Sequence, residues 1–128
     1  MSAEKNKEIV RDFIDRIWNR GLVDEIPNFI TPDYEAIGLR TTVFARGIDG
    51  VRNNVLGTRD AYRDLIIEID DMIAEGDKVA SRIRLRGTPV HQQATTWDRG
   101  ALTLDELIFH QLKEGKIIRA WSIGSDWR

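Results

Sequence analysis

The sequence contains no cysteine. Disulfide bonds, thiolate nucleophiles and cysteine-ligated metals are therefore excluded. The only histidines, His91 and His110, are far apart in the chain, so several ligands are not expected to converge on a metal. Gly47 and Gly50 lack the spacing and the strand context of a nucleotide-binding loop. We therefore expect no metal and no cofactor.

The chain also has no excess of positive charge. Its 128 residues include 19 basic and 21 acidic side chains, with a formal net charge of -2 at pH 7. Because both signs are interspersed, we expect no nucleic-acid partner and no membrane partner. No apolar run approaches the roughly 18 residues of a membrane span, and the opening MSAEKNKEIV lacks the apolar core of a signal peptide. We expect a soluble, cytoplasmic protein.

Helical spacing dominates the first part of the chain. Apolar residues fall on one stripe over residues 3–20, which predicts a helix that a glycine ends. The same spacing over 22–30 predicts a shorter helix, ended by Thr31-Pro32. Residues 33–39 are predicted to form a short strand. A loop is predicted over 40–46, although its Thr-Thr-Val-Phe run could pair locally.

Strand patterns follow a third helix, which is predicted over about residues 48–62. Residues 65–74 are rich in isoleucine, and a Glu75-Gly76-Asp77 turn joins them to an alternating run over 79–85, which predicts a hairpin. Residues 88–98 have no period and indicate a surface loop beside a cavity mouth.

The stretch ALTLDELIFHQLKEGKIIRAW, residues 101–121, predicts two long antiparallel strands joined by a tight turn at Gly115. Strand alternation places one set of side chains on a common face: Leu102, Leu104, Glu106, Ile108, His110 and Leu112. This face is apolar except for the carboxylate of Glu106 and the imidazole of His110. Burying either group without a partner costs several kcal/mol, so these residues are the candidate catalytic pair.

Glu106 and His110 are about 13 Å apart along the strand, so they could act on opposite ends of one small molecule. A histidine and a carboxylate against an apolar wall are the usual parts of acid–base chemistry. The competing interpretation is that this face belongs to a subunit interface, or that Arg82, Arg84 or the loop satisfies both groups. Because apolar neighbours remove the hydration of the charged form, we expect His110 to be neutral at pH 7.

Helices followed by a strand meander predict a single α+β domain over residues 1–128. A sheet that curls around its helices leaves a cone with a pocket inside. Trp18, Tyr62 and Trp121 could line this pocket, each with an apolar body and a polar tip, and equally they could be core.

The opposite strand face mixes polar side chains with Leu107 and Phe109. An exposed pair of this kind would be a liability on a monomer. We therefore expect an isologous homodimer through the sheet.

A resemblance to a known family rests on the segments NKEIVRDFIDRIWNRGLVDEIPNFITPDY, GIDGVRNNV, IIEIDDMIAEGDKVASRIRLRGT and IFHQLKEGKIIRAW. In order and spacing they resemble the SnoaL-like polyketide cyclase family, within the nuclear transport factor 2-like (NTF2-like) superfold, over nearly the whole chain. The resemblance implies a conical α+β barrel, commonly a homodimer, with an apolar pocket between the sheet and the first helices. This superfold hosts isomerases, dehydratases, epoxide hydrolases, cyclases and proteins without catalysis.

The sequence departs from the family where a catalytic acid is usual. The cyclases place an aspartate four residues after the tryptophan of the last strand, where this chain has Ser125, and Asp126 is predicted to face the other way. Many relatives carry a histidine or an acid in the first strand, where this chain has Glu35-Ala36-Ile37. Ketosteroid isomerases and limonene-epoxide-type hydrolases have an aspartate near the position of Ile108.

Two functions from different classes remain open. One is a cofactor-independent lyase or isomerase of the cyclase type, acting on a small, largely apolar carbonyl or polyketide-like molecule, with His110 as base or acid and Glu106 as its electrostatic partner. The other is a non-catalytic ligand-binding or dimerisation module that kept the cone and lost the acid. For either function the expected pocket lining comprises Trp18, Tyr62, Leu104, Ile108, Trp121 and Ser125.

Overall fold

The computed structural model describes residues 2–38, 42–90 and 102–124, and the backbone alone for Leu102. The first helical stripe folds as predicted, but in two parts. The α-helix α1 spans Ala3–Phe13 and continues directly into a π-helix, η1, over Ile14–Asn19. Ser2 caps α1 by accepting a hydrogen bond from the backbone N–H of Lys5.

The second predicted helix is shorter than expected. A 3₁₀ helix, η2, covers Val23–Asn28, and the strand β1 begins at Ile30 and runs to Gly38. The prediction of a helix through Ile30 is therefore wrong, and Thr31 and Pro32 lie in the strand. The reason is long-range pairing: Ile30 lies opposite Ile117, whose N–H donates to the carbonyl of Phe29 at 2.8 Å.

The next segments agree with the predicted patterns. Local pairing of the Thr-Thr-Val-Phe run is confirmed in part, since β2, Val43–Arg46, pairs antiparallel with β1. The third helix is confirmed as α2, Gly47–Ala61. Gly47 has a φ of +65°, which glycine adopts without strain.

The predicted meander of long strands is confirmed as β3 (Tyr62–Glu75), β4 (Lys78–Pro89), β5 (Leu102–Lys113) and β6 (Lys116–Gly124), each antiparallel to the next. One pairing was not predicted: β1 lies parallel to β6, so the sheet is mixed, with the order β2-β1-β6-β5-β4-β3. Gly76 and Gly115 turn the two hairpins at positive φ.

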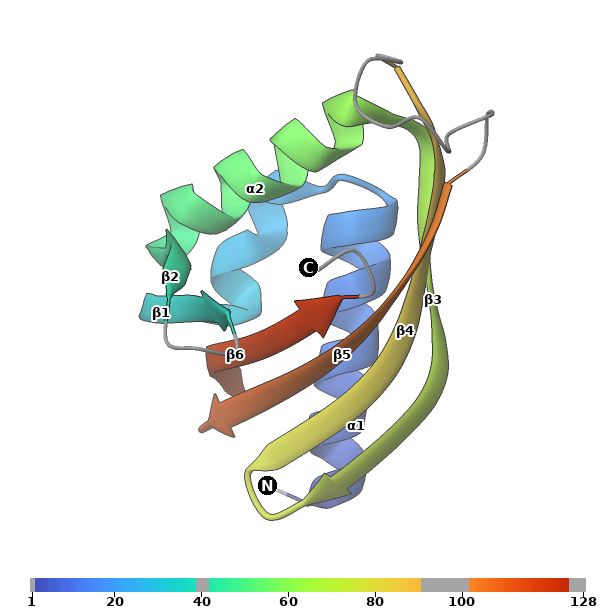
Figure 1. Ribbon diagram of the computed structural model, residues 1–128. Helices are drawn as coiled ribbons and strands as arrows, with labels where there is room; N and C mark the ends of the chain where they lie inside the picture. Colours follow the sequence, from blue (N-terminus) through green and yellow to red (C-terminus); the bar gives the residue numbers. More distant parts are fainter. Residues whose placement is uncertain (1, 39–41, 91–101, 125–128) are drawn as a thin grey trace.

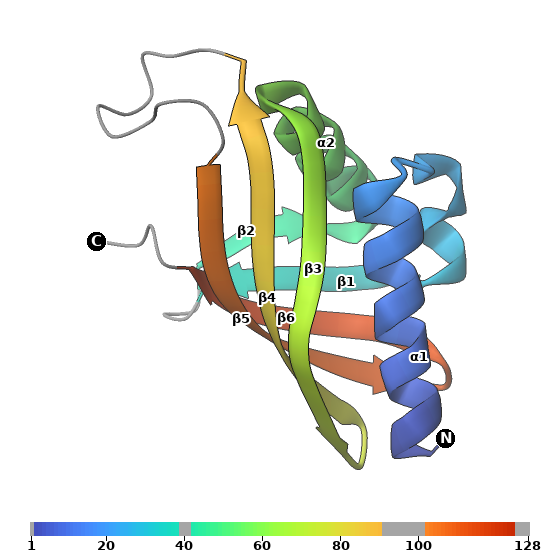
Figure 2. The same cartoon turned by 90° about the vertical axis from the view of Figure 1, so that its right-hand side faces the viewer.

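The sheet curls strongly, and α1 lies against its concave side while α2 crosses one end (Figures 1 and 2). The hydrophobic core fills the space between them, with Val10 and Ile17 from the helices and Val79, Ile83 and Ile117 from the sheet all fully or almost fully buried. This arrangement is the predicted α+β cone. No helix in the described part of the chain is long and apolar enough to cross a membrane.

Candidate functional site

A cavity of about 510 Å³ lies between the curved sheet and the helices. Its wall is mostly apolar, with Phe13 and Trp18 from the first helical segment, and Ile67, Ile83 and Leu85 from β3 and β4. A largely apolar cavity of this size with a few polar groups is typical of a small-molecule site.

The inner face of β5 forms one side of the cavity. Leu104, Glu106, Ile108 and His110 all line it, so the structure brings the two candidate polar residues to one wall, as strand alternation predicted. His110 lies between Val79 of β4 and Ala120 of β6. Glu106 lies further along β5, opposite Ile83 and Gly124, and is half-buried.

His110 is 3% exposed and lies edge-on to Phe13, with 6.4 Å between the ring centroids. Its Nδ1 is enclosed and has no hydrogen-bond partner among the described residues. Burial lowers the pKa of His110 from 6.5 to about 4, because the imidazolium loses its hydration. The imidazole is therefore neutral at pH 7, which agrees with the direction expected from the sequence.

Arg82 and Arg84 do not serve the candidate pair, so that part of the competing interpretation is wrong. Both lie on the outer face of the sheet, because they alternate with the buried residues of β4. Arg84 pairs with Asp70 at 2.9 Å and Arg82 with the same carboxylate at 3.7 Å.

The other expected pocket residues divide into three cases. Trp18 and Tyr62 line the cavity. Trp121 does not: it faces the outer side of the sheet, because the neighbouring Ala120 and Ser122 are the residues of β6 that reach the cavity. Its ring instead lies 6.0 Å from that of Phe109. Ser125 lies outside the described residues.

Sequence reasoning missed five polar residues of the cavity wall: Tyr34 on β1, Thr42 before β2, Asn54 and Thr58 on α2, and Ser122 on β6. Tyr34 is 5% exposed, and burial raises the pKa of its hydroxyl, so it stays protonated. The Thr58 hydroxyl donates to the Asn54 carbonyl at 2.8 Å. Tyr34 shares the inner side of β1 with Ala36, which lies opposite Ala120 of β6 at the cavity wall.

The π-helix that carries Trp18 is held by hydrogen bonds to α2 and β3. Arg59 of α2 donates to the carbonyls of Trp18 and Asn19 at 2.7 and 2.8 Å. The Asn19 side chain exchanges hydrogen bonds of 3.0 and 2.7 Å with the backbone of Ile67 on β3. Because both contacts reach η1 itself, they keep Trp18 at the cavity wall.

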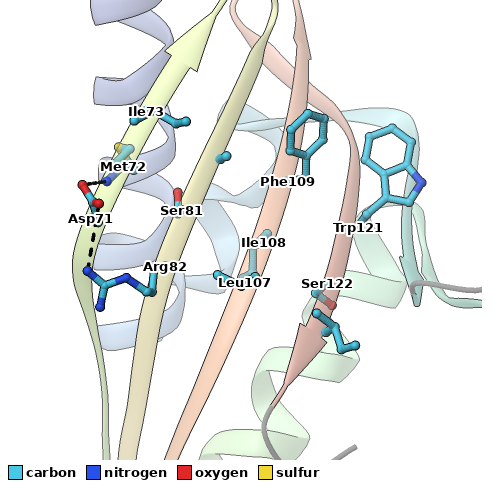
Figure 3. A pocket seen from close by; sticks show the side chains of 12 residues that line it. Asp71, Met72, Ile73, Ser81, Arg82, Leu107, Ile108, Phe109, Trp121 and Ser122 are labelled. Carbon is cyan, nitrogen blue, oxygen red and sulfur yellow. Dashed lines mark hydrogen bonds and ion pairs between the residues drawn. The ribbon is translucent and has the colours of Figure 1, made fainter.

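The outer face of the sheet carries a second hollow, of about 440 Å³ (Figure 3). We call it the outer groove, and it is lined mainly by Ile73, Leu107, Phe109, Trp121 and Ile123. Ile73 is 68% exposed, Leu107 57% and Phe109 41%. The apolar pair on this face of β5 is therefore exposed in the single chain.

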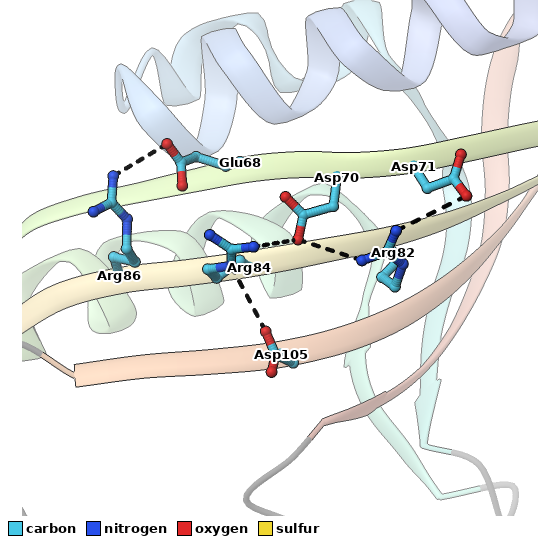
Figure 4. Close-up of polar contacts among 7 residues, drawn as sticks. All are labelled: Glu68, Asp70, Asp71, Arg82, Arg84, Arg86 and Asp105. Carbon is cyan, nitrogen blue, oxygen red and sulfur yellow. Dashed lines mark hydrogen bonds and ion pairs between the residues drawn. The ribbon is translucent and has the colours of Figure 1, made fainter.

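Beside the outer groove, ion pairs cross β3, β4 and β5 (Figure 4). This charge ladder comprises Glu68, Asp70, Asp71, Arg82, Arg84, Arg86 and Asp105. The described part of the chain holds no cluster of three or more histidine or acidic side chains that could bind a metal ion.

Comparison with solved structures gives neighbours at low identity. A SnoaL-like polyketide cyclase from Agrobacterium tumefaciens is 21% identical, with a TM-score of 0.80 over 98% of this chain and 94% of that one. TsrD from Streptomyces laurentii is 19% identical, with a TM-score of 0.81 over 98% and 91%. AclR from Streptomyces galilaeus, described as a candidate hydroxylase, is 20% identical, with a TM-score of 0.80 over 96% and 80%.

These likenesses establish the fold, an NTF2-like cone. No curated protein matches the chain. A family model described as SnoaL-like polyketide cyclase matches residues 8–126, almost the full length. The chain therefore belongs to the SnoaL-like polyketide cyclase family.

Proposed function

We propose that the cavity binds a small, largely apolar molecule that carries a carbonyl or hydroxyl group, and that His110 contacts this polar group. The observation that supports this most directly is the imidazole of His110, a polar group in the largely apolar wall of a cavity of about 510 Å³. A polar group in such a wall costs free energy unless it has a hydrogen-bond partner, and a ligand in the cavity could provide one.

Catalysis by proton transfer is the finer form of this proposal, with His110 as acid or base and Glu106 as its electrostatic partner. The two residues approach a ligand from different positions along β5, which suits a molecule with two reactive ends. At pH 7 a group with a pKa of about 4 is protonated only at a cost of about 4 kcal/mol. A proton taken from the substrate would therefore need a negative charge nearby to offset that cost.

The alternative is a binding module without turnover. The low basicity of His110 favours it, since general bases work best with a pKa near the operating pH. The descriptions of the structural neighbours, which include a cyclase and a candidate hydroxylase, are compatible with an enzyme. The two forms share the same ligand site, so binding is the first property to measure.

A matched pair of ligands tests the site. 2-Acetylnaphthalene and 2-ethylnaphthalene have nearly the same shape, and only the first offers a carbonyl oxygen. Isothermal titration should show the ketone binding roughly fivefold more tightly, as one neutral hydrogen bond of about 1 kcal/mol provides. His110→Leu should abolish the preference, and Thr58→Val, which removes a hydroxyl already bonded to Asn54, should keep it.

Two results would contradict the proposal. If neither naphthalene bound at its limit of solubility, the proposal of a site for such molecules would be wrong. Equal binding of the two by the wild type would remove His110 as the contact. Mass spectrometry of small molecules that copurify with the native protein would then identify the natural ligand class.

We also propose that the chain forms a homodimer in which the outer grooves of two copies face each other. The groove is apolar and exposed, and the charge ladder beside it alternates in sign, so a copy related by a two-fold axis can meet opposite charges. Burial of Leu107 and Phe109 would remove the exposed apolar surface from water.

A further inference from the structure

Two enclosed polar atoms on the inner face of the sheet lack a partner among the described residues. One is Nδ1 of His110 and the other is Oγ of Ser81 on β4. Both residues are 3% exposed, so open solvent does not satisfy either atom. Two unsatisfied groups on one buried face of the sheet would together cost several kcal/mol, which makes their relative position informative.

The strand register brings the two side chains to neighbouring positions. Ser81 lies opposite Ile108, and Val79 lies opposite His110, so Ser81 is diagonal to His110 across β4 and β5. Ser81 shares its face of β4 with the buried Val79 and Ile83, because successive strand residues alternate between the faces and Arg82, which follows Ser81, is exposed. Diagonal neighbours in an antiparallel pair are about 7–8 Å apart at Cα, which an aromatic ring can span.

We infer that the Ser81 hydroxyl is the hydrogen-bond partner of His110 Nδ1, either directly after rotation of the serine side chain or through one water molecule. Ser81 thereby fixes the imidazole in the tautomer that carries its proton on Nε2. Ser81 is then a positioning residue, since it acts on a ligand only through His110.

The direction of this hydrogen bond follows from what each arrangement leaves unsatisfied. If the Ser81 O–H donates toward Nδ1, the serine oxygen retains only an unused acceptor. If Nδ1–H donates to the serine, the hydroxyl proton remains without an acceptor in an enclosed place. Orphaned donors are rarer than under-used acceptors in proteins, so the first arrangement is favoured.

This tautomer narrows the class of ligand, and here the inference rests on the proposed function. Because Nδ1 is enclosed, Nε2 is the ring nitrogen of His110 that can meet a molecule in the cavity. An Nε2–H group donates, so the ligand offers an acceptor, such as a ketone, ester or amide oxygen. A neutral donor of this kind stabilises negative charge that develops on a carbonyl oxygen and does not accept a proton.

The tautomer can be measured in the ligand-free protein. Long-range ¹H–¹⁵N correlation spectra of protein labelled with ¹⁵N-histidine distinguish Nδ1–H from Nε2–H, and His91→Gln assigns the signals of the two histidines. At pH 7 we expect His110 to be entirely in the Nε2–H form. In Ser81→Ala we expect a mixture of the two tautomers, and in Ser81→Thr, which restores a hydroxyl, a return to Nε2–H.

Ser122→Ala is the matched control. Ser122 also lies opposite Ile108, on the β6 side, so it has the same diagonal relation to His110, but its hydroxyl is not among the enclosed unpartnered atoms. We expect this variant to keep the wild-type tautomer. The Nδ1–H form in the wild type, or an unchanged spectrum in a folded Ser81→Ala protein, would overturn the inference.

These results separate the inference from the proposed function. A tautomer that responds to Ser81 in a protein that binds neither naphthalene would sustain the positioning role and remove the ligand site. If the protein prefers the ketone but the tautomer of His110 is unchanged in Ser81→Ala, the ligand site would be sustained and the positioning role of Ser81 would be removed.

Discussion

The inner and outer faces of the same strands differ in how their polar side chains find hydrogen-bond and ion-pair partners. On β4, buried Val79, Ser81 and Ile83 alternate with exposed Arg82 and with Arg84. Outside, the arginines pair with carboxylates of the neighbouring strands, and inside, Ser81 and His110 carry atoms with no partner among the described residues. The inner face thus keeps its few polar groups in apolar surroundings, whereas the outer face pairs its charges in the open.

The difference shows that charge count is a poor guide to where function lies. The charge ladder holds many of the ionised groups of the sheet, yet exposed ion pairs of this kind contribute about 0–1 kcal/mol each. The few neutral polar groups inside carry a larger free-energy penalty and, for that reason, a stronger capacity to bind a matching ligand.

The same substitution on each face gives the largest contrast. Ile83→Ala, at a position 1% exposed, should lower the free energy of unfolding by about 3 kcal/mol, through lost burial and the space left behind. Ile66→Ala, at 41% exposure on β3, should cost about 1 kcal/mol or less. Urea denaturation with unchanged m-values measures both. Equal losses would show that the two faces are packed alike.

The titration of His110 gives the second effect. Its pKa is 6.5 in the unfolded chain and about 4 in the folded protein, so the unfolded state binds more protons between these pH values. The contribution of neutral His110 to the free energy of unfolding is therefore fully present above about pH 6.5. It decreases as the pH drops toward 4, by up to about 3 kcal/mol. His110→Leu should lose this part of the pH dependence of the free energy of unfolding. Parallel stability curves for the two proteins would place His110 in contact with solvent.

Dimer formation through the outer groove should be weakened by one charged side chain placed in the groove. Leu107→Asp puts a carboxylate where a second copy would bury it, so we expect the dissociation constant of the dimer to rise at least roughly 100-fold. Leu56→Asp, at a 42% exposed position on α2, should leave the mass unchanged. Light scattering at micromolar concentration measures the molecular mass of both variants. A monomeric wild type would refute the dimer outright.

The charge ladder should give the smallest effect. Coupling between Arg84 and Asp70, measured by a double-mutant cycle of Arg84→Ala and Asp70→Asn, should be about 0.5 kcal/mol and should decrease in high salt. A coupling of several kcal/mol that resists salt would mean that the outer face is buried in the assembly.

Much of the fold could be predicted because alternation and helical spacing are local properties. The faces of β5, the meander from β3 to β6 and the stripe of α1 all follow from side-chain periods of two or about 3.6 residues. The shortened second helix could not be predicted in this way, because pairing of Ile30 with Ile117 overrides the local helical spacing.

The site was predictable to a similar degree. Glu106 and His110 stand out as polar residues on an apolar strand face, and the structure brings both to the cavity. Trp121 was misplaced because the pairing of β5 with β6 shifts register between Gln111 and Leu112, so that Ala120, and not Trp121, reaches the cavity. Tyr34 was missed because the strand β1 was predicted without a partner, and only its parallel pairing with β6 shows which side faces inward.

The parallel pairing of β1 with β6 also determines the order in which the sheet can assemble during synthesis. β6 lies between β1 and β5 in the sheet, so β1 and β2 join the rest of the sheet only through the last described strand. During synthesis β1 emerges well before its partner β6, because α2, β3, β4 and β5 lie between them in the chain, and contacts between such distant segments form slowly. Until β6 emerges, β1 and β5 each present an open edge, so the period of greatest aggregation risk is synthesis itself.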